Sequence, residues 1–261
     1  MGAGATPEIA VHSDSDVLAA ATAARLVTRL VDLQATGGIP RIVLTGGGVG
    51  IKLLEEIRDS PARAAVDWSR IEFYWGDERF LPAGDPERNE TQARAALLDH
   101  VDVDPALVYP MGADVGTGPS GADEAAAEYA DLLARKARPE DHGEVPAFDV
   151  LMLGMGPEGH CASIFPESPA VYETDRTVVP VHNCPKPPPT RVSLTLPAIR
   201  TAAEVWIITG GEGKAAAVSM ALGGAGEVAI PVAGARGRRH TRWLLDRGAA
   251  AKLPKDLLGR G

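Results

Sequence analysis

Short apolar runs alternate with amphipathic stretches from one end of the chain to the other. The apolar runs predict strands at residues 9–11, 41–44, 71–75, 107–111, 148–153, 176–181, 192–194, 204–209 and 241–245. Helical patterns occupy residues 14–34, 89–100 and 122–136, and further helices begin near residues 51, 197 and 215. Strands that alternate with helices predict an α/β protein with a mostly parallel, open sheet and helices on both faces.

The first long helix is predicted from its cap and from its apolar spacing. Asp14 or Asp16 can accept hydrogen bonds from the N–H groups at its start, and Gly37 and Gly38 end it. The residues at helical spacing that we expect to face the core are Val17, Ala20, Ala24, Val27 and Val31.

Length and charge limit the functions that the chain can have. With 261 residues it could form one large α/β domain or two small ones. It shows no repeat and no change of composition that would mark a linker, so we expect one domain over residues 1–261 with a loose tail at 1–7. The net charge of −9 argues against a nucleic-acid partner. An anionic small substrate is still compatible, because local arginines can outweigh the overall charge.

Cysteine content and hydropathy indicate where the protein works. Two cysteines, Cys161 and Cys184, fit a reduced compartment better than a disulfide scaffold. The N-terminal residues lack the basic and apolar regions of a signal peptide. No apolar run approaches the ~20 residues that cross a bilayer. We therefore expect a cytoplasmic protein without a membrane partner.

The turn after the apolar run 148–153 is the strongest candidate for a chemical centre. It is rich in glycine, and a strand that ends in such a turn leaves N–H groups and one side chain facing a common space. That side chain is His160, which titrates near neutral pH and can act as a general base. Glu158 is placed to orient its ring. A structural histidine and a solvated acid are the simpler alternatives.

The same turn contains the spacing of a dinucleotide fingerprint, G-x-G-x-x-G, in Gly154, Gly156 and Gly159. That fingerprint requires a long crossover helix immediately afterwards. Pro166 and Pro169 break the chain too early for such a helix. We therefore expect no dinucleotide cofactor.

A second glycine-rich turn, Thr45-Gly46-Gly47-Gly48, joins the strand at 41–44 to a helix. This geometry binds anions, because the first N–H groups of the helix lack partners and its dipole favours negative charge. No Gly-Lys-Ser/Thr ends the turn, so it is not a Walker A motif. A tight turn that binds nothing is the alternative. Three consecutive glycines exceed what a turn requires, which favours phosphate binding.

Charged residues at other strand ends complete the candidate pocket. Asp77, Glu78 and Arg79 follow the strand at 71–75, where α/β proteins place their ligand crevice. Arg191 and Lys214 also lie at strand or loop boundaries, and cations there suit phosphate or carboxylate recognition. Each charge alone is more often a surface group. Together with the two glycine-rich turns they indicate a pocket for an anionic substrate.

Two other kinds of chemistry fit the sequence less well. Cys161 and Ser163 lack the motifs that accompany catalytic nucleophiles. A metal site could combine His160, Cys161, His182 and Cys184. Their spacing matches no standard zinc pattern, so we expect no metal.

Four motifs make the chain similar to the family of glucosamine-6-phosphate isomerases and 6-phosphogluconolactonases. In chain order they are LTGGG at 44–48, WGDERF at 75–80, LGMGPEGHCASIFP at 153–166 and RVSLTLPAI at 191–199, with a weaker fifth, ITGGEGK, at 208–214. The similarity covers nearly the whole chain. It implies a single three-layer domain of the modified Rossmann-like type, similar to NagB, RpiA and the CoA transferases.

Asp-Glu-Arg at 77–79 and Ala-Ser-Ile-Phe-Pro at 162–166 resemble the lactonase branch. This resemblance implies hydrolysis of 6-phospho-D-glucono-1,5-lactone to 6-phosphogluconate in the oxidative pentose phosphate pathway, without a cofactor or a metal. The candidate catalytic residues are His160, Glu158 and Arg79. The candidates for binding substrate or phosphate are Thr45, Gly46, Gly47, Gly48, Asp77, Arg191 and Lys214.

Two departures from the family pattern and two rival functions stay open. Glu158 stands where Asp is common, so its longer side chain could hold the histidine differently, and Gly48 replaces a common serine hydroxyl. The rivals are an amino-sugar phosphate isomerase/deaminase and a non-catalytic sugar-phosphate sensor. No helix-turn-helix output module is visible after residue 235. We expect a small sugar-phosphate lactone as the partner, and a monomer or small homo-oligomer.

Overall fold

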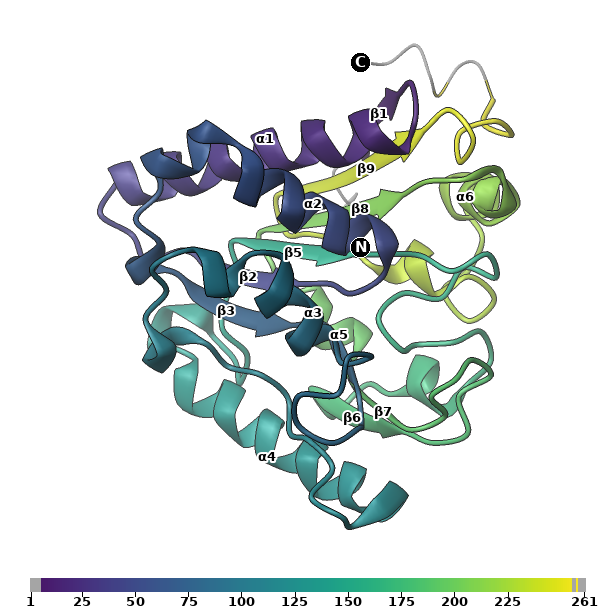
Figure 1. The fold of residues 1–261 in the computed structure, drawn as a ribbon. Helices are drawn as coiled ribbons and strands as arrows, with labels where there is room; N and C mark the ends of the chain where they lie inside the picture. The colour runs from purple at the N-terminus through teal and green to yellow at the C-terminus, as the bar shows by residue number, and fades with distance from the viewer. Residues whose placement is uncertain (1–5, 255–256, 258–261) are drawn as a thin grey trace.

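The larger of two sheets consists of six parallel strands in the order β1-β9-β8-β5-β2-β3 (Figure 1). The computed structural model describes residues 6–254 and 257. In sheet order the strands are β1 (Glu8–His12), β9 (His240–Asp246), β8 (Glu204–Thr209), β5 (Val150–Leu153), β2 (Arg41–Leu44) and β3 (Glu72–Trp75). Of the tail predicted at residues 1–7, only Thr6 and Pro7 lie within the described residues, and they have no regular structure.

A second, smaller sheet is antiparallel, which the sequence did not indicate. It has the order β4-β7-β6, formed by β4 (Asp77–Arg79), β7 (Arg191–Leu194) and β6 (Val178–Val181). Only Gly76 separates β3 from β4, so the chain passes directly from the large sheet into the small one. Residues 77–79, which were expected only to follow the strand at 71–75, therefore form a strand of their own, and the strands near 176–181 and 192–194 lie outside the parallel sheet.

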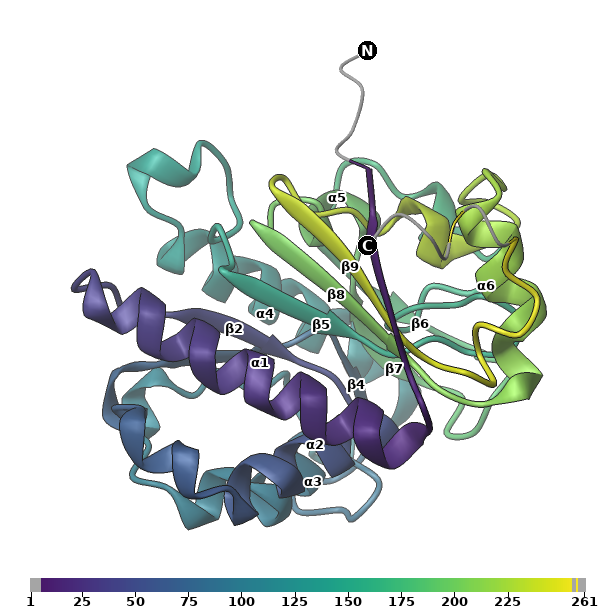
Figure 2. The ribbon, with the colours of Figure 1, turned by 90° about the horizontal axis from the view of Figure 1, so that it is seen from above.

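Helices cover both faces of the large sheet, as predicted (Figure 2). One face carries α1 (Ser15–Ala35), α2 (Gly48–Asp59) and α3 (Asn89–Ala96). The other carries α4 (Gly121–Lys136), α5 (Leu196–Ile199), α6 (Ala215–Leu222) and the small sheet. Side chains alternate between the two cores as a strand requires: Ile42 and Leu44 pack with α1 and α2, whereas Val43 packs toward α4. The predicted α/β class with a mostly parallel sheet is confirmed.

The long helix α1 begins as predicted but buries a different face. The Oδ1 atom of Asp14 accepts hydrogen bonds from the N–H groups of Asp16 (3.0 Å) and Val17 (2.9 Å). Val17 is 45% exposed and Ala20 and Ala24 are exposed as well, so the predicted face is wrong at these positions, whereas Val27 is buried as predicted and Val31 packs partly against the core. The buried residues are Leu18, Ala19, Thr22, Ala23, Leu26, Val27 and Leu30. The leucines decide the face because they bury more apolar area than alanine. The Thr22 hydroxyl is satisfied by the Leu18 carbonyl (2.7 Å).

Two predicted elements near residue 100 are shorter in the structure. The helix α3 ends at Ala96, and a separate 3-10 turn covers Leu98–His100. The predicted strand at 107–111 is wrong: only an isolated bridge joins Val108 to Phe73. Next to that bridge, the Tyr109 N–H group donates to the Phe73 carbonyl (2.9 Å).

The strand order reverses between β2 and β5. From β2 the chain moves outward to β3, and it then returns to place β5 on the opposite side of β2. In open α/β sheets this reversal leaves a crevice at the carboxyl ends of the two strands. Both glycine-rich turns of the sequence follow these strands. Within the described residues, no helix is both long and apolar enough to cross a membrane.

Candidate active site

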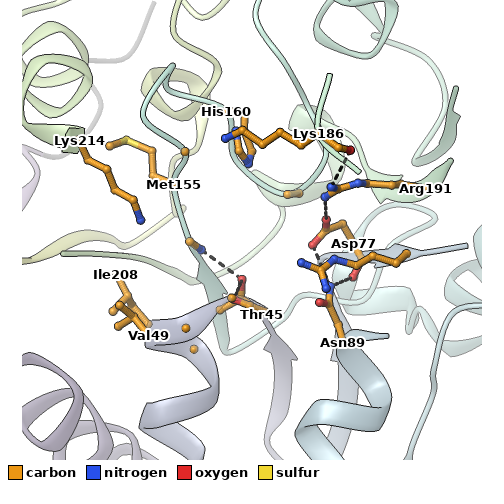
Figure 3. Close-up of a pocket in the computed structure, with 18 of the residues that line it drawn as sticks. Thr45, Val49, Asp77, Asn89, Met155, His160, Lys186, Arg191, Ile208 and Lys214 are labelled. Atoms are coloured by element: carbon orange, nitrogen blue, oxygen red, sulfur yellow. Dashed lines mark hydrogen bonds and ion pairs between the residues drawn. The ribbon is translucent and has the colours of Figure 1, made fainter. Parts of the chain in front are cut away.

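A pocket opens at the carboxyl ends of the central strands (Figure 3). It is lined by every predicted site residue except Glu158, which contacts the lining residue His160. The predicted residues that line it are Thr45, Gly46, Gly47, Gly48, Asp77, Arg79, His160, Arg191 and Lys214. Residues from five separate stretches of the chain therefore converge on one space.

His160 and Glu158 are in direct contact. The Nδ1 atom of His160 lies 2.8 Å from Glu158 Oε1. Burial alone would raise the pKa of Glu158, but hydrogen bonds from its own N–H group and from Lys186 hold that pKa below its usual value. An ionised carboxylate can only accept hydrogen bonds, so Nδ1 carries the proton. The lone pair is then on Nε2, where a general base needs it.

The pKa of His160 favours the neutral ring. Burial lowers it below its ordinary value of 6.5, and the charge of Lys186 lowers it further. Glu158 and Asp77 act in the opposite direction without reversing the shift. The side chain is only 15% exposed, and its ring packs against Phe165 with centroids 4.5 Å apart. At neutral pH the imidazole is therefore uncharged, with its proton on Nδ1 and a lone pair on Nε2.

Glycine is required directly beneath this pair. A Cβ atom on Gly156 would lie 2.1 Å from His160 Nδ1 and 2.7 Å from Glu158 Oε2. Gly159 has φ +88°, a conformation that favours glycine. The turn thus lets the imidazole and the carboxylate fold back over the backbone.

The Gly46–Gly48 loop leads into α2 as an anion site would require. Gly47 has φ +83° and caps α2, and among the described residues no side chain accepts the first N–H groups of this helix. A Cβ atom on Gly46 would meet Asn89 Oδ1 at 1.9 Å, so Asn89 packs closely on the loop. The Thr45 hydroxyl accepts a hydrogen bond from the Gly154 N–H group (3.1 Å), which joins the two glycine-rich turns.

Arg79 and Arg191 face each other across the small sheet. They are register partners on β4 and β7, so both side chains project from the same face. Asp77 lies two residues earlier on that face, with its Oδ2 3.9 Å from Arg191 Nη1 and 2.6 Å from the Ser163 hydroxyl. Two guanidinium groups and one buried carboxylate therefore form one side of the pocket.

Glu78 points away from the pocket, unlike its two neighbours. It is fully buried and accepts hydrogen bonds from the N–H groups of Arg79 (2.8 Å), Asn89 (2.6 Å) and Glu90 (2.9 Å). Burial raises its pKa to about 7 despite these donors and the nearby Arg88. Glu78 thus joins β4 to the start of α3 and fixes the backbone of Arg79. The sequence placed Glu78 with Asp77 and Arg79 because three charges in a row do not reveal strand alternation.

Two lysines also line the pocket: in Figure 3 Lys214 lies on the side opposite Arg191, whereas Lys186 lies beside Arg191 and next to His160. Lys214 follows β8, and burial together with the charge of Lys186 lowers its pKa. Lys186 also lines the pocket, and its Nζ donates to Glu158 Oε2 at 2.9 Å. The sequence analysis missed Lys186 because it lies in a proline-rich stretch that looks like a connector. Asn89 was also missed, since nothing before its helix suggested a pocket.

The structure gives no support to the cysteine and metal alternatives. Cys161 is fully buried, and burial raises the pKa of its thiol to about 12. The Ser163 hydroxyl is engaged by Asp77. Among residues 6–254 and 257, no group of three or more His, Cys, Asp and Glu side chains is arranged to hold a metal ion.

Known proteins share both the sequence and the fold. A family model described as glucosamine-6-phosphate isomerases/6-phosphogluconolactonase matches residues 13–243. A 6-phosphogluconolactonase of Streptomyces coelicolor is 58% identical over 252 residues, which cover 97% of each protein. One of Mycobacterium tuberculosis is 52% identical over 246 residues, covering 94% of this chain and 98% of the relative.

Solved structures agree with these relatives. The 6-phosphogluconolactonase of Trypanosoma brucei has a TM-score of 0.84 at 29% identity and covers 95% of this chain and 99% of its own. A monomeric glucosamine-6-phosphate deaminase has a TM-score of 0.75 at 16% identity, covering 94% and 99%, which shows a shared fold alone. The family model spans most of the chain, and the Streptomyces and Mycobacterium relatives match it almost end to end. This chain belongs to the family of glucosamine-6-phosphate isomerases and 6-phosphogluconolactonases.

Proposed function

We infer that the chain hydrolyses 6-phospho-D-glucono-1,5-lactone to 6-phospho-D-gluconate, with His160 as the general base. Relatives at 52% and 58% identity over nearly their whole length carry the name 6-phosphogluconolactonase. The observation that supports the chemistry is the contact between Glu158 and His160 beside a pocket lined by cations. The reaction belongs to the oxidative pentose phosphate pathway.

Hydrolysis begins with a water molecule at His160. The Nε2 lone pair takes a proton from that water while the water oxygen bonds to the lactone carbonyl carbon. Glu158 holds the Nδ1 proton and stabilises the imidazolium that forms. This general-base step contributes typically 10²–10⁴-fold to a rate.

The attack places negative charge on the former carbonyl oxygen. We assign Arg79 as the hydrogen-bond donor to this oxyanion. Its backbone is fixed by β4 and Glu78, and its side chain lines the pocket. A single preorganised donor of this kind is worth ~3 kcal/mol. Collapse of the intermediate breaks the bond to the ring oxygen, which receives the proton from His160. An ester carbonyl is already electrophilic, so the reaction as written needs no cofactor.

The phosphate would lie at the Gly46–Gly48 loop. Its partners there are the uncapped N–H groups of α2, together with Lys214 and Arg191 from other strand ends. Thr45 holds this loop against the turn that carries His160. Asp77 offsets the charge of Arg191 and keeps its guanidinium toward the pocket. Gly48 offers no hydroxyl, so backbone donors take the larger share.

The proposal includes a setting for the enzyme. We place the reaction in the cytoplasm, with the sugar-phosphate lactone as the partner and no nucleic acid. We expect a monomer or a small homo-oligomer.

A direct assay tests the function. The purified protein is added to freshly generated 6-phosphogluconolactone, and acid release is followed against the spontaneous rate. We expect hydrolysis well above that rate, and a large loss in the His160→Gln variant. Ammonia release from glucosamine 6-phosphate would instead support the isomerase/deaminase alternative. Tight binding of the lactone without turnover would support the sensor.

A further inference from the structure

We propose that Lys186 is a positioning residue that acts through Glu158 to keep His160 unprotonated. The proposal rests on the function inferred above, since it assigns a task to a residue beside the proposed base. Lys186 does not itself touch the reacting atoms in this assignment. Its effect passes through a chain of two hydrogen bonds.

The two oxygens of Glu158 have separate partners. Oε1 lies 2.8 Å from His160 Nδ1, and Oε2 accepts from Lys186 Nζ at 2.9 Å. The carboxylate is therefore held at both ends and cannot rotate away from the imidazole. Glu158 has a longer, more flexible side chain than an aspartate would have at this position. A second partner supplies the rigidity that the longer side chain lacks.

Lys186 is itself fixed by a buried arginine. Arg191 Nη2 donates to the carbonyl oxygens of Lys186 and Pro187, and Arg191 Nε donates to that of Pro188, all at 3.2 Å. The Cys184 N–H group donates to the Pro189 carbonyl at 2.8 Å and closes the loop. Arg191 is only 5% exposed, and the prolines restrict the backbone further. The proline-rich segment thus holds the backbone of Lys186 in a fixed position.

The charges around His160 determine what the loss of Lys186 would do. Glu158 and Asp77 favour the imidazolium, whereas Lys186 opposes it. Arg191 lies near Phe165, the ring that packs against His160, with its guanidinium carbon 6.0 Å from the Phe165 centroid. The other charged groups that line the pocket are Arg79 and Lys214. Removal of Lys186 therefore leaves the carboxylates with less opposition.

This arrangement helps both halves of the reaction. Before attack, an unprotonated ring is needed to accept the proton of water. After attack, an imidazolium that is not held too tightly by Glu158 returns its proton to the ring oxygen. Lys186 weakens the hold of Glu158 on the imidazolium, so it keeps the ring neutral before attack and favours return of the proton afterwards, at the cost of some basicity.

Titration of the resting protein tests the proposal without any substrate. The His160 ring is followed by NMR from pH 4.5 to 8.5, with its signal assigned by its absence in His160→Gln. In Lys186→Met the midpoint should move to higher pH, and in Glu158→Gln to lower pH. Lys186→Arg should restore the wild-type midpoint, because it keeps the cation. Lys252→Met, an exposed lysine away from the pocket, should leave the midpoint unchanged.

The kinetic profile gives the second readout. In Lys186→Met the acid limb of kcat/KM should move to higher pH with the His160 midpoint, so the loss is larger at pH 5.5 than at pH 8. If Lys186 were only a phosphate ligand, KM would rise at every pH and the NMR midpoint would not move; that result overturns the proposal. If the midpoints move as expected in a protein without lactonase activity, the link from Lys186 to His160 stands and the proposed function fails.

Discussion

At the scale of single residues, the site depends on contacts between neighbours that are close in sequence. Glu158, Gly156 and His160 lie within five positions of one another, and the carboxylate, the imidazole and the bare backbone fit together only in this order. The sequence identified the pair because two-residue spacing across a turn allows contact. It could not identify Lys186, because this residue is 26 positions from His160 in the sequence and only the tertiary fold brings it close.

Replacing the proposed base should separate chemistry from binding. In His160→Gln we expect kcat to fall by roughly 10²–10⁴-fold, because proton abstraction from water is lost. The affinity for 6-phosphogluconate, measured by calorimetry, should change by less than about threefold. His240→Gln is the control, since that histidine is exposed and pairs only with Glu8 among the described acids. Near-normal turnover in His160→Gln would refute the assignment.

A single methyl group beneath the imidazole should also disable the site. In Gly156→Ala the new Cβ would overlap His160 Nδ1, so the ring must move and break its contact with Glu158. We expect kcat to fall by about tenfold or more, since a misplacement near 1 Å can cost 10²-fold. Gly226→Ala meets no atom within 4 Å and should keep full activity. Equal activity in both variants would show that the observed packing is not needed.

At the scale of elements, the strands of the large sheet and the start of α1 followed from the sequence. Apolar runs bounded by turn residues are sufficient to place β2, β5 and β8. The pairing of residues 77–79 with 191–193 was not predictable in this way, because it depends on segments more than 100 positions apart. The face of α1 was misjudged because alanines and valines fit more than one stripe, and only the leucines at 18, 26 and 30 settle which stripe is buried.

Gly47 at the start of α2 and Gly37 just after α1 are a matched pair of glycines for testing the phosphate site. Gly47 and Gly37 have φ +83° and +82°, and a Cβ at either would meet nothing within 4 Å. Each alanine variant should therefore lose ~1–2 kcal/mol of stability from the left-handed backbone alone. Only Gly47→Ala should also raise KM, because it disturbs the N–H groups at the pocket. Denaturant unfolding and steady-state kinetics check the two parts, and equal KM values in both variants would argue against this loop as the phosphate site.

At the scale of the whole molecule, the pocket joins two sheets. His160 and the Gly46–Gly48 loop extend from the parallel sheet, whereas Arg79 and Arg191 extend from the antiparallel one. The chain passes from the parallel sheet to the antiparallel sheet at Gly76, the single residue between β3 and β4. A ligand that contacts both sides should therefore stabilise the protein as a unit.

Product binding should raise the thermal stability measurably. At 100 times its Kd, 6-phosphogluconate adds about 2.7 kcal/mol, which corresponds to a rise in Tm of roughly 5–10 °C for a chain of this size. Gluconate, which lacks the phosphate, should give a much smaller rise at the same concentration. Lys214→Met should reduce the effect of 6-phosphogluconate more than that of gluconate. Scanning calorimetry supplies the measurement, and identical shifts from the two ligands would contradict a phosphate site at Lys214.

The register of Arg79 opposite Arg191 has one more consequence. Like charges directly across a sheet repel, and the single carboxylate of Asp77 offsets only one of them. Arg79 Nη1 donates to the Glu87 carbonyl, and an oxyanion bound in the pocket should offset the remaining positive charge. Sulfate or phosphate in the buffer should therefore compete with the substrate and raise the apparent stability of the enzyme. Its stability without a bound oxyanion is better measured in a chloride buffer.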